Sequence, residues 1–194
     1  ANNTVMYNGL LQTNSGGTWK LNGGSATAIS GSTITTGLAS DAFTISGYAA
    51  KKNVVDTPFD DGLTLTPSGS TSAANYNITY SNGSLKITPA PLGVTVSGTY
   101  NGTTTYSTPN ATIGLNGLVG GDVGGTASSV TVNSPNVGGS NYVTGVTPNA
   151  GGTPWLASNY VINGTYGATG AGGNITPGAA GTDGSGNPTN NSGT

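Results

Sequence analysis

The chain has 194 residues, of which 35 are glycine, none is cysteine and only 5% are charged. Four lysines and six aspartates give a net charge of −2, and arginine, glutamate and histidine do not occur. Without these residue types the usual nucleophile–base pairs and zinc sites cannot be built, so we expect no enzyme. The lack of a basic patch argues against nucleic acid as a partner. No apolar run reaches the roughly 18 residues that membrane insertion needs.

The composition favours strands and turns over helices. Threonine and tyrosine favour strands, while glycine, asparagine and proline favour turns. The apolar residues recur in short alternating runs, which disordered Gly- and Ser-rich chains lack. We therefore expect a folded, all-β protein. The absence of cysteine excludes a disulfide framework and is compatible with a bacterial surface protein.

Residues 1–91 form the first β-rich repeat domain in this interpretation. Period-two alternation between turn residues predicts its strands. They are expected at residues 18–21, 28–35, 42–48, 63–66, 76–80 and 85–88.

The end of this domain carries the strongest pattern. Residues 76–80 alternate apolar and polar side chains, residues 85–88 do the same, and Asn82-Gly83 between them is preferred in tight hairpin turns. We therefore expect an antiparallel hairpin here. Pro89 and Pro91 follow, and we expect them to end the strand and form a proline-rich hinge, because proline has no N–H for a ladder.

A second β-rich repeat domain is expected at residues 92–177. Its predicted strands lie at residues 93–97, 111–115, 128–132, 142–146 and 160–162, with a last strand that ends at Ile175. Residues 178–194 contain no large apolar side chain, so we expect a Gly/Ser/Asn-rich linker or extended arm there.

Landmarks of the first domain return in the same order in the second, about 85 residues later. The matched pairs include Tyr7-Asn8-Gly9 with Tyr100-Asn101-Gly102, Asp41 with Asp122, Asn75-Tyr76 with Asn159-Tyr160, and Ile87-Thr88-Pro89 with Ile175-Thr176-Pro177. Six or seven short strands per repeat predict two tandem small Ig-like β-sandwich domains joined by the hinge. A β-solenoid is the alternative, but it needs a period of about 20–30 residues, which the sequence does not show.

Two motifs at the junction carry a family resemblance. Residues 75–92 read NYNITYSNGSLKITPAPL, and Tyr100-Asn101-Gly102-Thr103-Thr104 follows them. This junction resembles the one between tandem mostly-β, glycine-rich repeats of large bacterial filamentous haemagglutinin-like adhesins. The resemblance covers most of residues 5–177. It implies export from Gram-negative cells and a place in the stalk of a long surface protein.

The expected function is therefore a non-enzymatic, extracellular structural module of a bacterial surface adhesin or filament. Such a stalk or spacer serves cell adhesion and biofilm formation, and its partners are neighbouring repeats or identical subunits. Two alternatives stay open. One is a self-assembling filament subunit that uses a terminal arm for β-strand addition, and the other is a carbohydrate-binding module.

Calcium is the one cofactor with candidate ligands. Asp183, Ser185 and Asn187 place oxygen atoms at alternate positions, and Asp56, Asp60 and Asp61 form a second acidic group. No acidic residue closes the first group. The second reads as an exposed turn before Gly62, because adjacent strand residues point to opposite faces. We therefore expect no bound cofactor.

Two residues are candidates for contact with a partner. Trp155 follows Gly-Gly-Thr-Pro, so we expect it in a loop, where it and the tyrosines could stack on host or matrix glycans; core packing is the alternative. Ile175 lies in the last expected strand, just before the arm of residues 178–194. This arm, or residues 1–6 at the other end, could pair with the open sheet edge of an identical subunit, and the strand at Ile175 followed by the arm is the feature that allows it.

Overall fold

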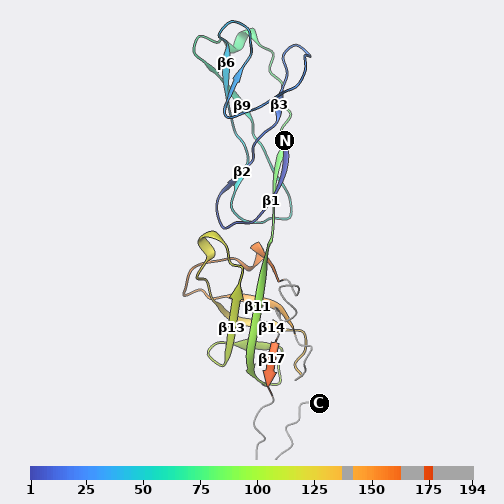
Figure 1. Ribbon diagram of the computed structural model, residues 1–194, viewed down its shortest axis with the longest axis vertical. Helices are drawn as coiled ribbons and strands as arrows, with labels where there is room; N and C mark the ends of the chain where they lie inside the picture. Colours follow the sequence, from blue (N-terminus) through green and yellow to red (C-terminus); the bar gives the residue numbers. More distant parts are fainter. Residues whose placement is uncertain (137–141, 163–172, 177–194) are drawn as a thin grey trace, which may run out of the picture. The chain divides into compact units, whose positions relative to one another are not determined.

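The computed structural model describes residues 1–136, 142–162 and 173–176. Within them the regular elements are β-strands and short 3-10 helices, so the chain is all-β, as predicted. The strands form several small sheets of two to four strands. The chain divides into two compact units, Ala1–Thr88 (unit 1) and Pro89–Thr194 (unit 2) (Figure 1). Each unit has its own buried apolar residues.

Unit 1 contains the first ten strands and one 3-10 helix. Their bounds are β1 Asn2–Met6, β2 Gln12–Thr13, β3 Thr18–Trp19, β4 Thr27–Ala28, β5 Thr33–Thr35, β6 Ala42–Ser46, β7 Ala50–Lys51, β8 Phe59–Asp60, β9 Thr64–Ser68, η1 Ala73–Asn75 and β10 Ser84–Thr88. Two three-stranded sheets, β1-β10-β8 and β5-β6-β9, provide most of the structure. Alternation along β6 and β10 buries Phe43, Ile45, Leu85 and Ile87 on one face of each strand.

Unit 2 contains seven strands and two 3-10 helices in its described residues. Their bounds are β11 Ala90–Thr99, β12 Thr105–Ser107, β13 Ala111–Asn116, η2 Gly120–Asp122, β14 Ala127–Val132, β15 Val143–Pro148, η3 Ala157–Asn159, β16 Tyr160–Ile162 and β17 Gly173–Thr176. The long strand β11 is central: β13 pairs with one part of it, and β16 and β17 pair with it in parallel. A second sheet has the order β12-β14-β15.

The two units share the pairing of their first and last strands. In unit 1, β1 runs parallel to β10, and Val5 lies opposite Ile87. In unit 2, β11 runs parallel to β17, and Gly98 lies opposite Ile175. Val5 and Gly98 each stand two residues before the repeated tyrosine, Tyr7 or Tyr100. The first and last strands of the two repeats are therefore paired in the same register.

The expected hairpin at residues 76–88 is wrong. Residues 76–83 form no strand, and neither Asn82 nor Gly83 has the positive φ of a tight hairpin turn. The reason is that β10 already has a neighbour on each side, β1 and β8. A Cβ on Gly83 would collide with the backbone of Ala1, so this glycine serves the close approach of the chain start and not a turn.

The proline-rich segment is also more regular than expected. β10 ends at Thr88 and β11 begins at Ala90, so Pro89 alone separates the two strands. Pro91 lies within β11, opposite Val161 of β16. Ala90 and Pro91 are therefore part of the sheet of unit 2, which corrects the expectation that they form a linker.

The remaining strand predictions agree with the structure in position, apart from their bounds. The strand expected at residues 28–35 is divided between β4 and β5. Five strands were not predicted, namely β1, β2, β7, β8 and β12. Four of these, β2, β7, β8 and β12, have only two or three residues, and periodicity cannot detect such short segments. Residues 178–194, the expected arm, lie outside the described residues.

Candidate functional site

Unit 1 contains an apolar groove of about 530 Å³. Its floor is the sheet β5-β6-β9, which contributes Ile34, Phe43, Ile45 and Leu65. In the register of this sheet Ile34 lies opposite Phe43, and Ile45 lies opposite Leu65. Because alternate strand residues point to the same face, these four side chains form a continuous apolar surface.

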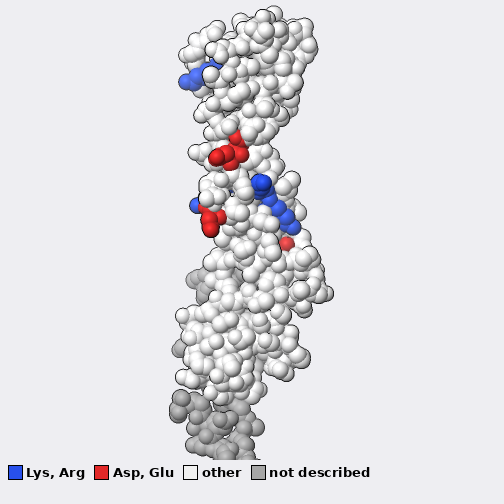
Figure 2. Space-filling view, turned by 180° about the vertical axis from the view of Figure 1, so that it is seen from behind, with Lys and Arg blue, Asp and Glu red and all other residues white. Residues whose placement is uncertain are grey.

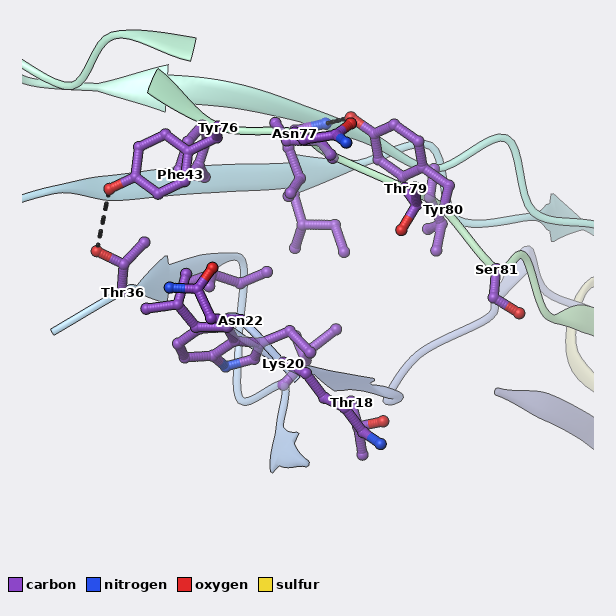
Figure 3. Close-up of a pocket in the computed structure, with 18 of the residues that line it drawn as sticks. Thr18, Lys20, Asn22, Thr36, Phe43, Tyr76, Asn77, Thr79, Tyr80 and Ser81 are labelled. Carbon is purple, nitrogen blue, oxygen red and sulfur yellow. Dashed lines mark hydrogen bonds between the residues drawn. The ribbon is translucent and has the colours of Figure 1, made fainter. Parts of the chain in front are cut away.

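Two segments form the walls of the groove. Residues 18–22 line one side, and residues 75–81 line the other (Figure 3). Trp19 and Leu21 are half-buried on the first wall, as are Tyr76 and Ile78 on the second. Lys20 is the one charged residue among those that line the groove. The groove therefore combines an apolar floor with walls that carry polar side chains, such as Asn22 and Asn77, and it suits an uncharged occupant.

Two tyrosine hydroxyls fix the second wall to the sheet. Tyr76 Oη donates a 2.7 Å hydrogen bond to Asp41 Oδ2, and its ring meets Phe43 edge-to-face at 5.0 Å. Tyr80 Oη accepts a 3.0 Å hydrogen bond from the backbone N–H of Leu65. The turn after β5 holds Asp41 near Tyr76, because the backbone carbonyl of Asp41 accepts a hydrogen bond from the N–H of Thr36. The second wall is thus anchored through tyrosine side chains, and these two hydrogen bonds do not occupy its backbone N–H and C=O groups.

The wall segment after Tyr76 has no strand partner among the described residues. Tyr76 has φ −128° and ψ 135°, which is the extended conformation. No strand pairs with residues 77–81, and no backbone hydrogen bond is found for their N–H groups. The unpaired N–H groups of this segment could therefore accept a partner strand beside a groove whose floor is apolar.

In unit 2, the segment that corresponds to residues 76–78 is paired with another strand. η3 leads into Tyr160 as η1 leads into Tyr76, and Tyr160 Oη donates a 2.8 Å hydrogen bond to Asp122 Oδ2. Trp155 meets the Tyr160 ring edge-to-face at 5.7 Å. Here the segment after the tyrosine is β16, and it pairs in parallel with Ala90–Leu92 of β11. The tyrosine–aspartate pairs belong to residues matched by the sequence repeat, but their hydrogen bond was not predicted.

Burial shifts the acidity of this tyrosine. Loss of solvent around the ring, together with the Asp122 carboxylate, raises the pKa of Tyr160 from 10.0 to about 12, although the N–H of Val119 opposes the shift. The hydroxyl therefore stays protonated and donates throughout the neutral range.

A buried carboxylate in unit 1 corrects the expectation of an exposed turn. Asp61 is only 2% exposed. Its Oδ1 and Oδ2 accept hydrogen bonds of 2.9 and 2.8 Å from Asn14 Nδ2, and Oδ1 also accepts the N–H of Ala49 at 2.8 Å. Asn14 in turn accepts a bond from Asn3 at 2.6 Å. This network ties β1, β2 and the loop after β8 together, and nothing in the sequence pattern distinguishes Asp61 from Asp60.

The calcium candidates do not come together in the described residues. Asp60 lies in β8 and is exposed, Asp56 lies in an exposed loop, and Asp61 is occupied by its network. No group of three or more acidic, histidine or cysteine side chains that could hold a metal ion is found in residues 1–136, 142–162 and 173–176. Asp183, Ser185 and Asn187 lie outside these ranges.

The two candidate partner-contact residues have different positions. Trp155 is 5% exposed, and its Nε1 donates a 2.9 Å hydrogen bond to the Thr126 carbonyl. It therefore belongs to the core of unit 2, because the Pro154 loop folds it inward against Tyr160, and the expectation of an accessible loop residue is corrected. Ile175 lies in β17, opposite Gly98.

Charge is sparse on the surface. All four lysines belong to unit 1, and Figure 2 shows wide areas without any charged side chain. The Nζ atom of Lys51 lies 5.0 Å from the centroid of the Phe59 ring, so this lysine makes a cation–π contact. This surface offers no basic patch for a polyanion in the part that the structure describes.

Comparisons with known proteins add no identification. No protein-family model, no curated protein and no solved structure matches the chain. None of the helices in the described residues has the length and apolar character required to cross a bilayer. The repeated strand pairing and the groove are therefore the features of the chain that bear on function.

Proposed function

We propose that the chain is a non-enzymatic, force-bearing spacer of a bacterial surface adhesin or filament. Its resemblance to glycine-rich adhesin repeats supports the extracellular location and the role in adhesion. The observation that carries the mechanical part is the parallel pairing of the first and last strands in both units. We also propose that the small sheets of each unit make up an Ig-like sandwich.

The parallel pair places the two ends of each unit at opposite ends of the same ladder. Tension on the chain pulls β1 and β10 in opposite directions along their axes, so that the hydrogen bonds of five residue pairs share the load. In an antiparallel terminal pair, tension would separate the bonds one at a time. The terminal ladder of each unit therefore acts as a clamp.

The joint between the units suits the same role. A single residue, Pro89, separates the last strand of unit 1 from the first strand of unit 2. Proline restricts φ and adds little slack, so tension passes directly from one terminal ladder to the next. Proline also favours extended backbone at the residue before it, which here is Thr88.

Stretching single molecules of the full chain from its two ends tests this function. We expect discrete unfolding events, each of which releases roughly 300 Å for about 85 residues. The absence of catalysis is tested separately, because turnover of a glycan or peptide substrate by the purified chain would contradict it. Gradual extension at low force, without discrete events, would rule out a load-bearing role.

A filament subunit is the second candidate, because the unpaired segment at residues 77–81 could accept a strand. Carbohydrate binding draws less support, since Trp155 is buried. Trp19, Tyr76 and Tyr80 still line the groove, so a glycan is treated below as a competing occupant.

A further inference from the structure

We propose that the groove of unit 1 is an acceptor site for an extended proline-containing peptide, such as the segment that joins one repeat to the next. The occupant would have the sequence character of residues 88–92, Thr-Pro-Ala-Pro-Leu, and would add as a parallel strand to residues 76–78. This inference rests on the proposed function and deepens it, because it gives the spacer a specific site for another repeat.

The first argument is that unit 2 contains this arrangement. Ala90, Pro91 and Leu92 pair in parallel with Tyr160, Val161 and Ile162, in that order. Ala90 is 1% exposed and Leu92 is 0% exposed, so both side chains are buried in unit 2. A peptide of this sequence therefore fits beside the segment that follows a tyrosine–aspartate pair.

The second argument is the register of the repeat. Tyr160 corresponds to Tyr76, since both follow a 3-10 helix and both donate to the aspartate of their unit. The same register places the alanine of the peptide opposite Tyr76, its second proline opposite Asn77 and its leucine opposite Ile78. Residues 76–80 also have the alternation of a strand, which the structure leaves unpaired.

The third argument is chemical. The groove lies between residues 18–22 and 75–81, and its floor is apolar (Figure 3). An Ala-Pro-Leu segment has no charged side chain, and in the register of unit 2 its alanine and leucine side chains point to the same, buried face. The extended backbone that proline imposes lowers the entropy lost on binding. Main-chain hydrogen bonds to the unpaired segment would supply the orientation.

Binding of a synthetic peptide, Ile-Thr-Pro-Ala-Pro-Leu-Gly, to the full chain tests the proposal. Residues 87–93 supply the sequence, and a fluorescent label allows anisotropy measurements. We expect saturable binding that protects amides within residues 76–79 from hydrogen exchange, because the register places the peptide opposite these residues. A peptide with aspartate in place of leucine should bind at least about tenfold more weakly, because a charge would enter the apolar groove.

Two leucines of unit 1 provide a matched pair of variants. Leu38 lines the groove and is 49% exposed, whereas Leu11 lies outside it and is 68% exposed. Both can be changed without disturbing the core. We expect Leu38→Asp to weaken peptide binding about tenfold and Leu11→Asp to leave it unchanged. Equal effects of the two variants would show that the peptide binds elsewhere.

A covalent fusion of the peptide to the chain tests the site even if the free peptide binds weakly. The register makes Ala1 equivalent to Val94, so Ile-Thr-Pro-Ala-Pro-Leu-Gly fused before Ala1 would reach the groove. High effective concentration should then raise the Tm of unit 1 by several degrees relative to a fusion with aspartate in place of leucine. If neither free nor fused peptide has these effects, or if an oligosaccharide protects residues 76–79 instead, the acceptor site is wrong. The proposed spacer function would survive that result, because stretching the chain tests it independently.

Discussion

At the scale of single residues, a tyrosine hydroxyl bonded to an aspartate recurs in both units. Tyr76 donates to Asp41 in unit 1, and Tyr160 donates to Asp122 in unit 2. Each bond fixes the start of an extended segment against the sheet. Asp122 is 2% exposed, so the bond in unit 2 lies in a drier environment and should matter more for stability.

Replacing Tyr160 with phenylalanine should therefore destabilise unit 2. The Tyr160→Phe change removes a donor from Asp122 and an acceptor from the N–H of Val119, at a cost of about 1–3 kcal/mol. Thermal unfolding measures this loss. Tyr142→Phe is the control, because Tyr142 is exposed, and its removal should change the Tm little. Equal shifts for both variants would contradict this assignment.

The same tyrosine predicts a dependence on alkaline pH. The folded pKa of Tyr160, about 12, lies above its ordinary value of 10.0. The protonated hydroxyl thus contributes stability that is complete below pH 10 and is lost as pH rises towards 12. The free energy of unfolding should fall over this window, and less steeply in Tyr160→Phe. Some slope remains in that variant, since burial also raises the pKa of Tyr106.

Substitution of the buried Asp61 should lower stability more than substitution of its exposed neighbour, Asp60. In Asp61→Asn one acceptor becomes an NH₂ group that faces the Asn14 amide, which already donates to both oxygens. We expect unit 1 to lose about 1–3 kcal/mol, whereas Asp60→Asn on the exposed neighbour should change stability little. Chemical denaturation of both variants measures the difference. A tolerant Asp61 site would mean that the buried network is not structural.

At the scale of elements, the backbone just after β6 lies close to the backbone just before β9. Gly47 has φ +85°, and a Cβ there would collide with the carbonyl of Gly62. Gly31 has a similar φ of +73°, but no atom lies within 4 Å of its ideal Cβ.

Alanine substitutions at these two glycines separate crowding from backbone strain. Both Gly47→Ala and Gly31→Ala should lose about 1 kcal/mol from the positive φ. Gly47→Ala should lose more, because the backbone of Gly62 must also move. Thermal melts of the two variants give the comparison, and a larger loss for Gly31→Ala would refute the role given to Gly62.

The elements also show what periodicity could and could not predict. Alternation located β6, β10 and β14, because each buries one face. It predicted a strand at residues 76–80 where the structure has none, since pairing depends on which strands already flank β10. The groove needed this tertiary information as well: its walls come from segments more than 50 residues apart. The burial of Asp61 could not be predicted, because the pattern of apolar residues carries no information about which aspartate is buried.

At the scale of the whole chain, the sequence repeat and the strand pairing agree. Landmarks of the repeat, such as Tyr7 and Tyr100, follow strands that have the same parallel partner in each unit. The same repeat implies that the groove of unit 1 and the site of Ala90–Leu92 in unit 2 are two states of one feature, open and filled.

The central claim is that the terminal ladder of each unit bears load, and pulling unit 1 in two directions tests it most directly. The chain has no cysteine, so paired cysteines can attach handles at chosen points. Asn2→Cys with Thr88→Cys pulls the β1–β10 ladder from opposite ends, whereas Asn2→Cys with Ser84→Cys pulls it from the same end. Both proteins are kept reduced until the handles are coupled. We expect the first pair to rupture at a clearly higher force than the second at the same loading rate, because its bonds share the load. Equal rupture forces would contradict the account.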